Sequence, residues 1–156
     1  MMRDWKALLY FYAATFAVQV GGNFFTMKTV TTWYPTLEKS ILTPPGYWFG
    51  IVWTTLYIVM AIAAWRIWRA ERNGFFSRTL APWWAQLALG LLWCAVFFGL
   101  REIDAGLIII FINWLVILAT IARFLCVERM AGYLLVPLGL WVTFATYLNL
   151  VISLKN

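Results

Sequence analysis

Aromatic side chains, rather than acids or bases, are the residues of this sequence that could form a functional site. The chain of 156 residues contains 11 Trp, 7 Tyr and 12 Phe. Trp53 and Tyr57, and Trp93 and Phe97, are four residues apart inside long apolar runs, and Trp141 lies in a further run. Residues four apart share one face of a helix. Such stripes could stack on a flat apolar ligand, and they are equally typical of core packing and of membrane-interface belts.

Acid–base, nucleophilic and metal-ion chemistry have no support in the sequence. There is no histidine, and every carboxylate lies at an edge of an apolar run: Asp4, Glu38, Glu71, Glu102, Asp104 and Glu128. A nucleophile needs an adjacent base, and a metal site needs clustered ligands. No charge falls near the middle of a run, which disfavours an ion-driven transporter. Cys94 and Cys126 lack motif spacing, and we expect both to be small buried apolar residues. We therefore predict no metal site and no acid–base catalytic residue.

The apolar runs that must position these aromatic residues are long enough to cross a membrane. The sequence is 64% hydrophobic and 12% charged, against about 45–50% and about 25% in soluble domains. A membrane-spanning helix needs about 20 apolar residues. We predict an all-α integral membrane protein, a single domain over residues 1–156 that forms a five-transmembrane-helix bundle. The predicted helices cover about 7–27, 45–68, 80–100, 104–126 and 130–153.

Two of these helices carry more specific expectations. The helix over 104–126 is the most uniformly aliphatic, with Asn113 as its only strongly polar residue, so we expect it to face lipid or another subunit. Trp65 and Trp68 lie beside arginines near the end of the helix over 45–68. Tryptophan and arginine are enriched where helices leave the bilayer, and we therefore expect both indoles in an interfacial belt.

The connection over residues 28–45 is too rich in proline to be helical throughout. It contains Pro35, Pro44 and Pro45 together with the pair Trp33-Tyr34. Proline removes a backbone donor and keeps the preceding residue out of the helical region. We predict a structured loop. It is either a lid over a ligand pocket or a linker anchored at the membrane interface by its two aromatic residues.

Four ordered blocks of the sequence resemble the tryptophan-rich sensory protein / translocator protein (TspO/MBR) family over nearly the whole chain. The blocks are Trp33-Tyr34, Leu37-Glu38-Lys39 and Pro44-Pro45; Val52-Trp53-Thr54, Leu56-Tyr57 and Met60; Gln86-Leu87-Ala88-Leu89, Trp93, Phe97-Phe98-Gly99 and Arg101; and Leu135-Val136-Pro137, Trp141, Phe144-Ala145-Thr146 and Leu148-Asn149. Four blocks in this order are far more specific than any one of them.

This resemblance implies a five-helix membrane protein, often a homodimer, that binds porphyrins and other hydrophobic ligands in a pocket closed by the first loop. Such a protein acts as a sensor, carrier or regulator of tetrapyrroles such as protoporphyrin IX. It requires no cofactor, and its partners are the ligand and membrane lipid, with no nucleic acid. Carried over position by position, the ligand-binding residues implied are Trp33, Pro44, Trp53, Tyr57, Trp93, Phe97, Trp141 and Ala145.

Two alternative functions remain open at the level of sequence. Some family members are reported to promote light-dependent porphyrin breakdown through the tryptophans matching Trp53 and Trp141. The other alternative is a structural or partner-regulating membrane protein. The chain also departs from the family pattern in the loop and on the third helix, at Ser40, Leu42, Gly90 and Cys94. These departures remove a proline, an indole and polar groups from the implied pocket.

The distribution of basic residues predicts the orientation in the membrane. With five spans, the side holding the N-terminus collects eight Lys and Arg residues and the other side four. Basic flanks remain in the cytoplasm of an inner membrane. A reporter fused after Asn156 should therefore be exported, whereas one inserted in the 69–78 loop should remain cytoplasmic. Reporter activity in the two compartments measures this, and the reverse pattern would contradict it.

Overall fold

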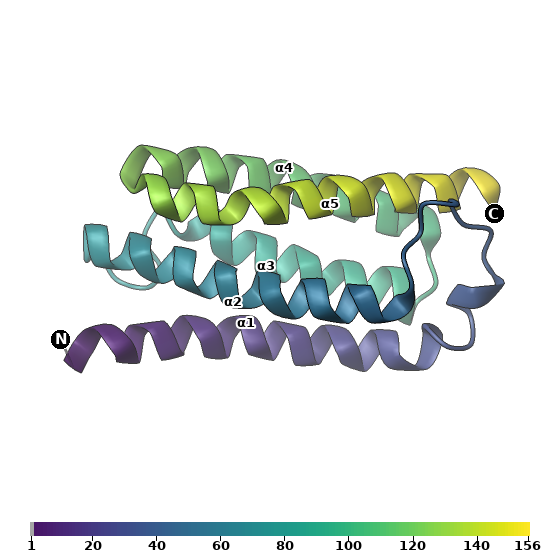
Figure 1. Ribbon diagram of the computed structural model, residues 1–156, viewed down its shortest axis with the longest axis horizontal. Coiled ribbons are helices and arrows are strands. Elements are labelled where there is room, and N and C mark those ends of the chain that lie inside the picture. The colour runs from purple at the N-terminus through teal and green to yellow at the C-terminus, as the bar shows by residue number, and fades with distance from the viewer. Residues whose placement is uncertain (1) are drawn as a thin grey trace.

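Five long helices lie side by side in the computed structural model, which describes residues 2–156, with side chains from Asp4 onward (Figure 1). They are α1 (Met2–Thr29), α2 (Gly46–Glu71), α3 (Ala81–Trp93), α4 (Ile103–Val127) and α5 (Arg129–Lys155). The described residues contain no strand. The predicted fold class, an all-α bundle with a structured connection between the first two helices, is confirmed.

Local sequence explains where most of these helices begin. Pro45 immediately precedes α2, and Pro82 lies in the first turn of α3, where a helix has no donor to lose. Glu128 caps α5 by accepting hydrogen bonds from the backbone N–H groups of Met130 and Ala131. The first helix begins at Met2 rather than Ala7. Charged residues end an apolar run without ending a helix, so the sequence pattern underestimated its length.

Four segments are long and apolar enough to cross a membrane, namely α2, Ala81–Gly99, α4 and α5. The 28-residue α1 is of similar length but less apolar, and it packs along α2 and α3. Gln19 of α1 donates a hydrogen bond of 2.7 Å to the hydroxyl of Thr54 on α2. Together these helices make the chain an integral, multi-pass membrane protein.

The predicted third helix changes its winding before it ends. After Trp93 the chain forms a π-helix, η2 (Cys94–Gly99). The Leu100 N–H accordingly bonds to the carbonyl of Ala95, five residues back, at 2.9 Å. The consecutive side chains of Phe97 and Phe98 are both buried in this segment. Short π segments of this kind often occur at functional sites.

Two interpretations of the sequence are wrong in the structure, and a third holds only in part. Trp68 is buried and stacks on Phe75 with ring centroids 5.6 Å apart, so it belongs to the core and not to an interfacial belt. Cys126 is exposed on the outer surface of the bundle. The expectation for α4 holds for one face only, because Ile110, Asn113 and Ile117 are buried against the other helices while its opposite face is exposed. The spacing of apolar residues did not show which face of each helix turns inward.

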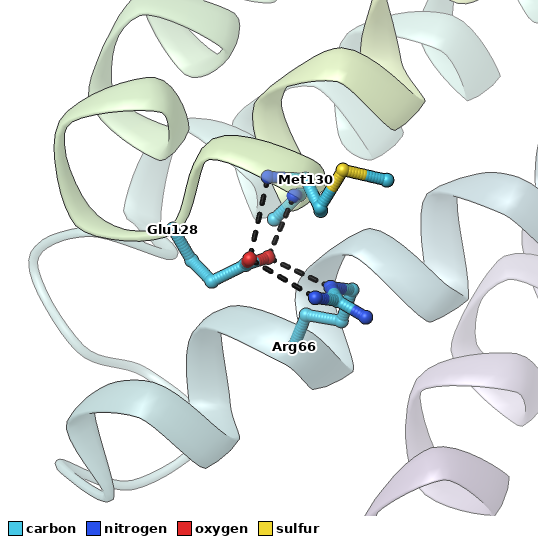
Figure 2. A network of polar contacts seen from close by, with 4 residues as sticks. Arg66, Glu128 and Met130 are labelled. Carbon is cyan, nitrogen blue, oxygen red and sulfur yellow. Dashed lines mark hydrogen bonds and ion pairs between the residues drawn. The ribbon is translucent and has the colours of Figure 1, made fainter.

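A charged contact fastens α2 to the start of α5 at the end of the bundle opposite the first loop (Figure 2). The Arg66 guanidinium donates to both carboxylate oxygens of Glu128, at 2.7 and 3.0 Å. The same carboxylate accepts the backbone N–H groups that begin α5. The hydrogen bond from Arg66, followed by the smaller backbone contributions, lowers the pKa of Glu128 from 4.5 to about 2.

Removing this carboxylate should therefore destabilise the bundle in a pH-dependent way. Glu128→Ala loses both the cap and the ion pair, and we expect a loss of roughly 1–3 kcal/mol at pH 7. A lowered carboxylate pKa stabilises the fold above the unfolded value of 4.5, and this contribution disappears as pH falls through about 2. Thermal unfolding in detergent at pH 7 and pH 3 measures the difference. Arg66→Ala, which keeps the cap, should lose less. A deficit independent of pH would contradict this assignment.

Candidate ligand-binding site

The first loop folds over one end of the bundle and rests on the π segment. Its short 3₁₀ turn, η1 (Tyr34–Thr36), follows Trp33. The Trp33 ring meets Phe97 edge-on at 5.6 Å, and Tyr34 lies 5.8 Å from Phe98. Below them, Trp93 stacks on Phe97 at 5.4 Å with an interplanar angle of 15°. The structure thus brings three predicted site residues, Trp33, Trp93 and Phe97, into one aromatic cluster.

Lys39 holds this loop in a compact shape, a role that the sequence did not predict, because Lys39 stood out there only as part of a family block. Its ammonium donates to the carbonyls of Tyr34 at 2.9 Å, Pro35 at 3.2 Å and Leu37 at 2.7 Å. It also lies 5.1 Å from the centre of the Tyr34 ring. Burial in this arrangement raises the pKa of the Tyr34 phenol. The loop is therefore an ordered cap.

The far side of the cap is hydrogen-bonded to the end of α5. The Glu38 backbone N–H donates to the Asn156 side-chain oxygen at 3.0 Å, and the Asn156 amide donates back to the Glu38 carbonyl at 3.1 Å. Ser40 shares a hydrogen bond of 3.2 Å with the Tyr147 hydroxyl. Lys155 donates to the Lys39 carbonyl at 3.4 Å. Ser40, one of the departures from the family pattern, thus supplies a closing contact.

A small internal cavity lies deeper in the bundle, at the level of the middle of α2, α4 and α5. Trp53 and Tyr57 of α2 form part of its wall, with ring centroids 5.8 Å apart. Gly90 of α3 and Asn113 of α4 line it as well. Its volume is about 20 Å³. Ligand sites for drug-sized molecules usually enclose about 300–1,000 Å³, so in this structure the pocket is closed.

Trp93 connects the aromatic cluster under the loop to the core around this cavity. It packs against both groups of side chains. Its indole N–H donates to the Asn149 side chain of α5 at 3.0 Å, and Asn149 donates in turn to the carbonyl of Ile103 at 3.4 Å. Aromatic side chains therefore continue from Trp33 in the cap, through Trp93, to the core that contains Trp53.

The remaining predicted site residues lie elsewhere. Trp141 lines a shallow apolar groove of about 490 Å³ between α2 and α5, where it meets Phe49 at 5.7 Å. Ala145 is buried in the core, and Pro44 is half-buried just before α2. The groove is open to the outside of the bundle, so Trp53 and Trp141 border different cavities.

These features define a multi-pass helical membrane protein whose aromatic core is covered by an ordered first loop. Comparison with known proteins agrees: the TspO/MBR family model matches residues 11–154. The chain is 39% identical to the tryptophan-rich protein TspO of Archaeoglobus fulgidus over 145 residues, covering 92% of each chain. It is 37% identical to the tryptophan-rich sensory protein of Cereibacter sphaeroides, covering 96% of this chain and 90% of the relative.

The similarity extends to the human translocator protein, with 33% identity over 120 residues, 75% of this chain and 70% of the relative. The chain therefore belongs to the TspO/MBR family. This confirms the resemblance recognised from the four blocks of sequence.

Loosening the bond between the cap and α5 should make the loop more mobile. Asn156→Ala removes two hydrogen bonds to the Glu38 backbone, worth about 1–3 kcal/mol together. Hydrogen exchange at the Glu38 amide should accelerate roughly tenfold, since about 1.4 kcal/mol is a factor of ten. Mass spectrometry of the loop peptide in detergent measures this rate.

A matched control is available at the same end of α5. Ser153→Ala removes a hydrogen bond to Asp104 without touching the loop, and it should leave exchange at Glu38 unchanged. Equal acceleration in the two variants would mean that the end of α5 frays as a whole, and would contradict a specific contact with the cap.

Proposed function

We propose that this protein binds tetrapyrroles such as protoporphyrin IX, and other flat hydrophobic ligands, in the aromatic pocket beneath the first loop. It acts as a sensor, carrier or regulator of these ligands. Family membership supports the proposal, and the names of its relatives describe a sensory protein in one case and a translocator in another. With the N-terminus in the cytoplasm, ligands reach the loop from the opposite side of the membrane.

The observation that carries the proposal is the aromatic path from the cap to the core. The Trp33 ring meets Phe97 edge-on, and Phe97 stacks on Trp93. Trp93 also packs against the core that Trp53 and Tyr57 contact. Offset stacking on such rings is favourable by about 0.5–1.5 kcal/mol for each contact beyond simple burial. A flat ligand that inserts between these rings exchanges ring–ring contacts for equivalent ring–ligand contacts. Insertion therefore costs little free energy in lost aromatic contacts.

Ligand entry requires the cap to lift, because the closed cavity is far smaller than a tetrapyrrole. The cap is held by four hydrogen bonds to α5, worth roughly 2–6 kcal/mol in total. Burying ~400–500 Å² of apolar ligand surface gains about 10–13 kcal/mol. Association costs about 4–15 kcal/mol. At the favourable end of each range about 7 kcal/mol remains after the cap has opened, which corresponds to binding of roughly ten micromolar.

Tryptophan fluorescence tests the proposal. Titrating the detergent-solubilised protein with protoporphyrin IX should give a saturable quench. Trp53→Ala should weaken the affinity about tenfold, since it removes one stacking face and its buried area. Trp53→Phe keeps an aromatic face and should retain most of the affinity. Unsaturable quenching in the unmodified protein would overturn the proposal.

Trp5 provides the control for these two variants. It lies near the start of α1, at the end of the bundle opposite the loop, and is 52% exposed. Trp5→Ala removes the same side chain and should leave porphyrin affinity unchanged. A loss equal to that of Trp53→Ala would show that general destabilisation, rather than a site at Trp53, causes the effect.

A further inference from the structure

Two amide side chains in the middle of the bundle have polar atoms without a partner among the residues whose side chains the structure describes. Gln86 of α3 is only 2% exposed and Asn113 of α4 only 6%. Both polar atoms of the Gln86 amide and the Asn113 oxygen lack a hydrogen bond. Among the described residues only the indole nitrogen of Trp141 is also buried without a partner, and Trp141 does not line the same cavity. Other buried polar side chains are bonded, such as Thr120 to the carbonyl of Val116 at 2.7 Å. The two amides share one cavity and therefore need a common physical account.

Both amides line the internal cavity, on either side of Gly90. A Cβ atom at Gly90 would lie 3.8 Å from the Asn113 amide nitrogen, an ordinary contact distance. The absence of a side chain at Gly90 therefore leaves space next to Asn113, one helical turn from Gln86. Trp53 and Tyr57 face the same space from α2. The cavity thus combines aromatic walls with unpaired amides.

The chemistry of the amides limits what this space can hold. Each amide carries both hydrogen-bond donors and an acceptor. The apolar side chains and lipid around them offer no hydrogen-bond partner. No charged residue lines the cavity, and burying an isolated charge there would be far more costly than burying a neutral group. The volume of about 20 Å³ exceeds the ~10–15 Å³ that one water requires. A small neutral group that both donates and accepts hydrogen bonds fits all of these conditions.

We propose that Gln86 and Asn113 form a polar floor of the ligand pocket that binds such a group. In the ligand-free protein the group is an ordered water. In the complex it is a neutral hydroxyl or amide substituent of the hydrophobic ligand, which displaces the water. The second half rests on the proposed ligand-binding function, and the first half does not. The floor orients a ligand whose remaining surface contacts aromatic side chains.

The water is tested by two substitutions at one position. Gly90→Ala and Gly90→Ser place the same Cβ in the helix and differ only in a hydroxyl. Intrinsic helix propensity favours alanine. The cavity has room for about one water, so the added side chain displaces it in both variants and only the serine hydroxyl replaces its hydrogen bonds. Gly90→Ser should therefore unfold at a temperature about 2–4 °C above that of Gly90→Ala. A melting temperature of Gly90→Ser equal to or below that of Gly90→Ala would overturn this half of the proposal.

The ligand group is tested with two flat probes of nearly equal shape, 2-naphthol and 2-methylnaphthalene. In the double variant Gln86→Met with Asn113→Leu, the affinity for 2-naphthol should fall about tenfold, while that for 2-methylnaphthalene stays within twofold. Equal losses for both probes, or a loss for neither, would overturn recognition of a ligand group by the floor. Competition with protoporphyrin IX shows whether the probes occupy the proposed pocket.

The outcomes separate this inference from the function on which it partly rests. If protoporphyrin IX fails to bind but Gly90→Ser still melts above Gly90→Ala, the proposed function is wrong and the water site stands. If protoporphyrin IX binds and the naphthalene probes do not distinguish the double variant, the function stands and the polar floor does not select ligands. The Gly90 pair also remains informative if the double variant does not fold.

Discussion

Hydrogen bonding without water is the constraint on which the rest of this structure depends. Inside a membrane, each polar group must find its partner within the protein, and several tryptophans meet this demand, whereas the buried indole nitrogen of Trp141 has no partner among the described residues. Five of the 11 indoles donate their N–H to another part of the chain, two of them to carbonyls of a neighbouring helix. The donors are Trp65, Trp83, Trp84, Trp93 and Trp114. Much of the tryptophan content therefore joins helices to one another and to their connections, and only part of it is available to a ligand.

The candidate site lies where polar groups lack a hydrogen-bond partner within the protein, or where the hydrogen bonds that they make are easily broken. Under the loop, rings contact rings and the closing hydrogen bonds lie at the edge of the bundle, within reach of water. Deeper in the bundle, Gln86 and Asn113 have polar atoms with no partner among the described side chains, beside Gly90. Elsewhere small residues give tight contact, as at Gly132, where a Cβ would come within 2.5 Å of Leu125.

The sequence predicted the number of helices, the loop and the family, because long apolar runs and proline positions are local signals. It predicted less about the site. Four-residue spacing shows that Trp141 and Ala145 share a face, but it does not identify the neighbour that this face meets, and Trp141 borders the outer groove. The π segment was also missed, since its winding depends on how Phe97 and Phe98 pack beneath the loop. Asn113 looked like an isolated polar residue on a lipid-facing helix, because partners on other helices leave no trace in local periodicity.

The contact between Glu38 and Asn156 joins residues 118 positions apart in the chain. During synthesis the N-terminal parts of a chain emerge and fold first. The loop is therefore made before α2 to α5, and its partner residues on α5 are not yet present. The hydrogen bonds between the loop and α5 can therefore form only after α5 has been made. Until then the loop has only its contacts with segments that come earlier in the chain than α5, such as that of Trp33 with Phe97, and the end of the bundle under the loop is closed on one side only.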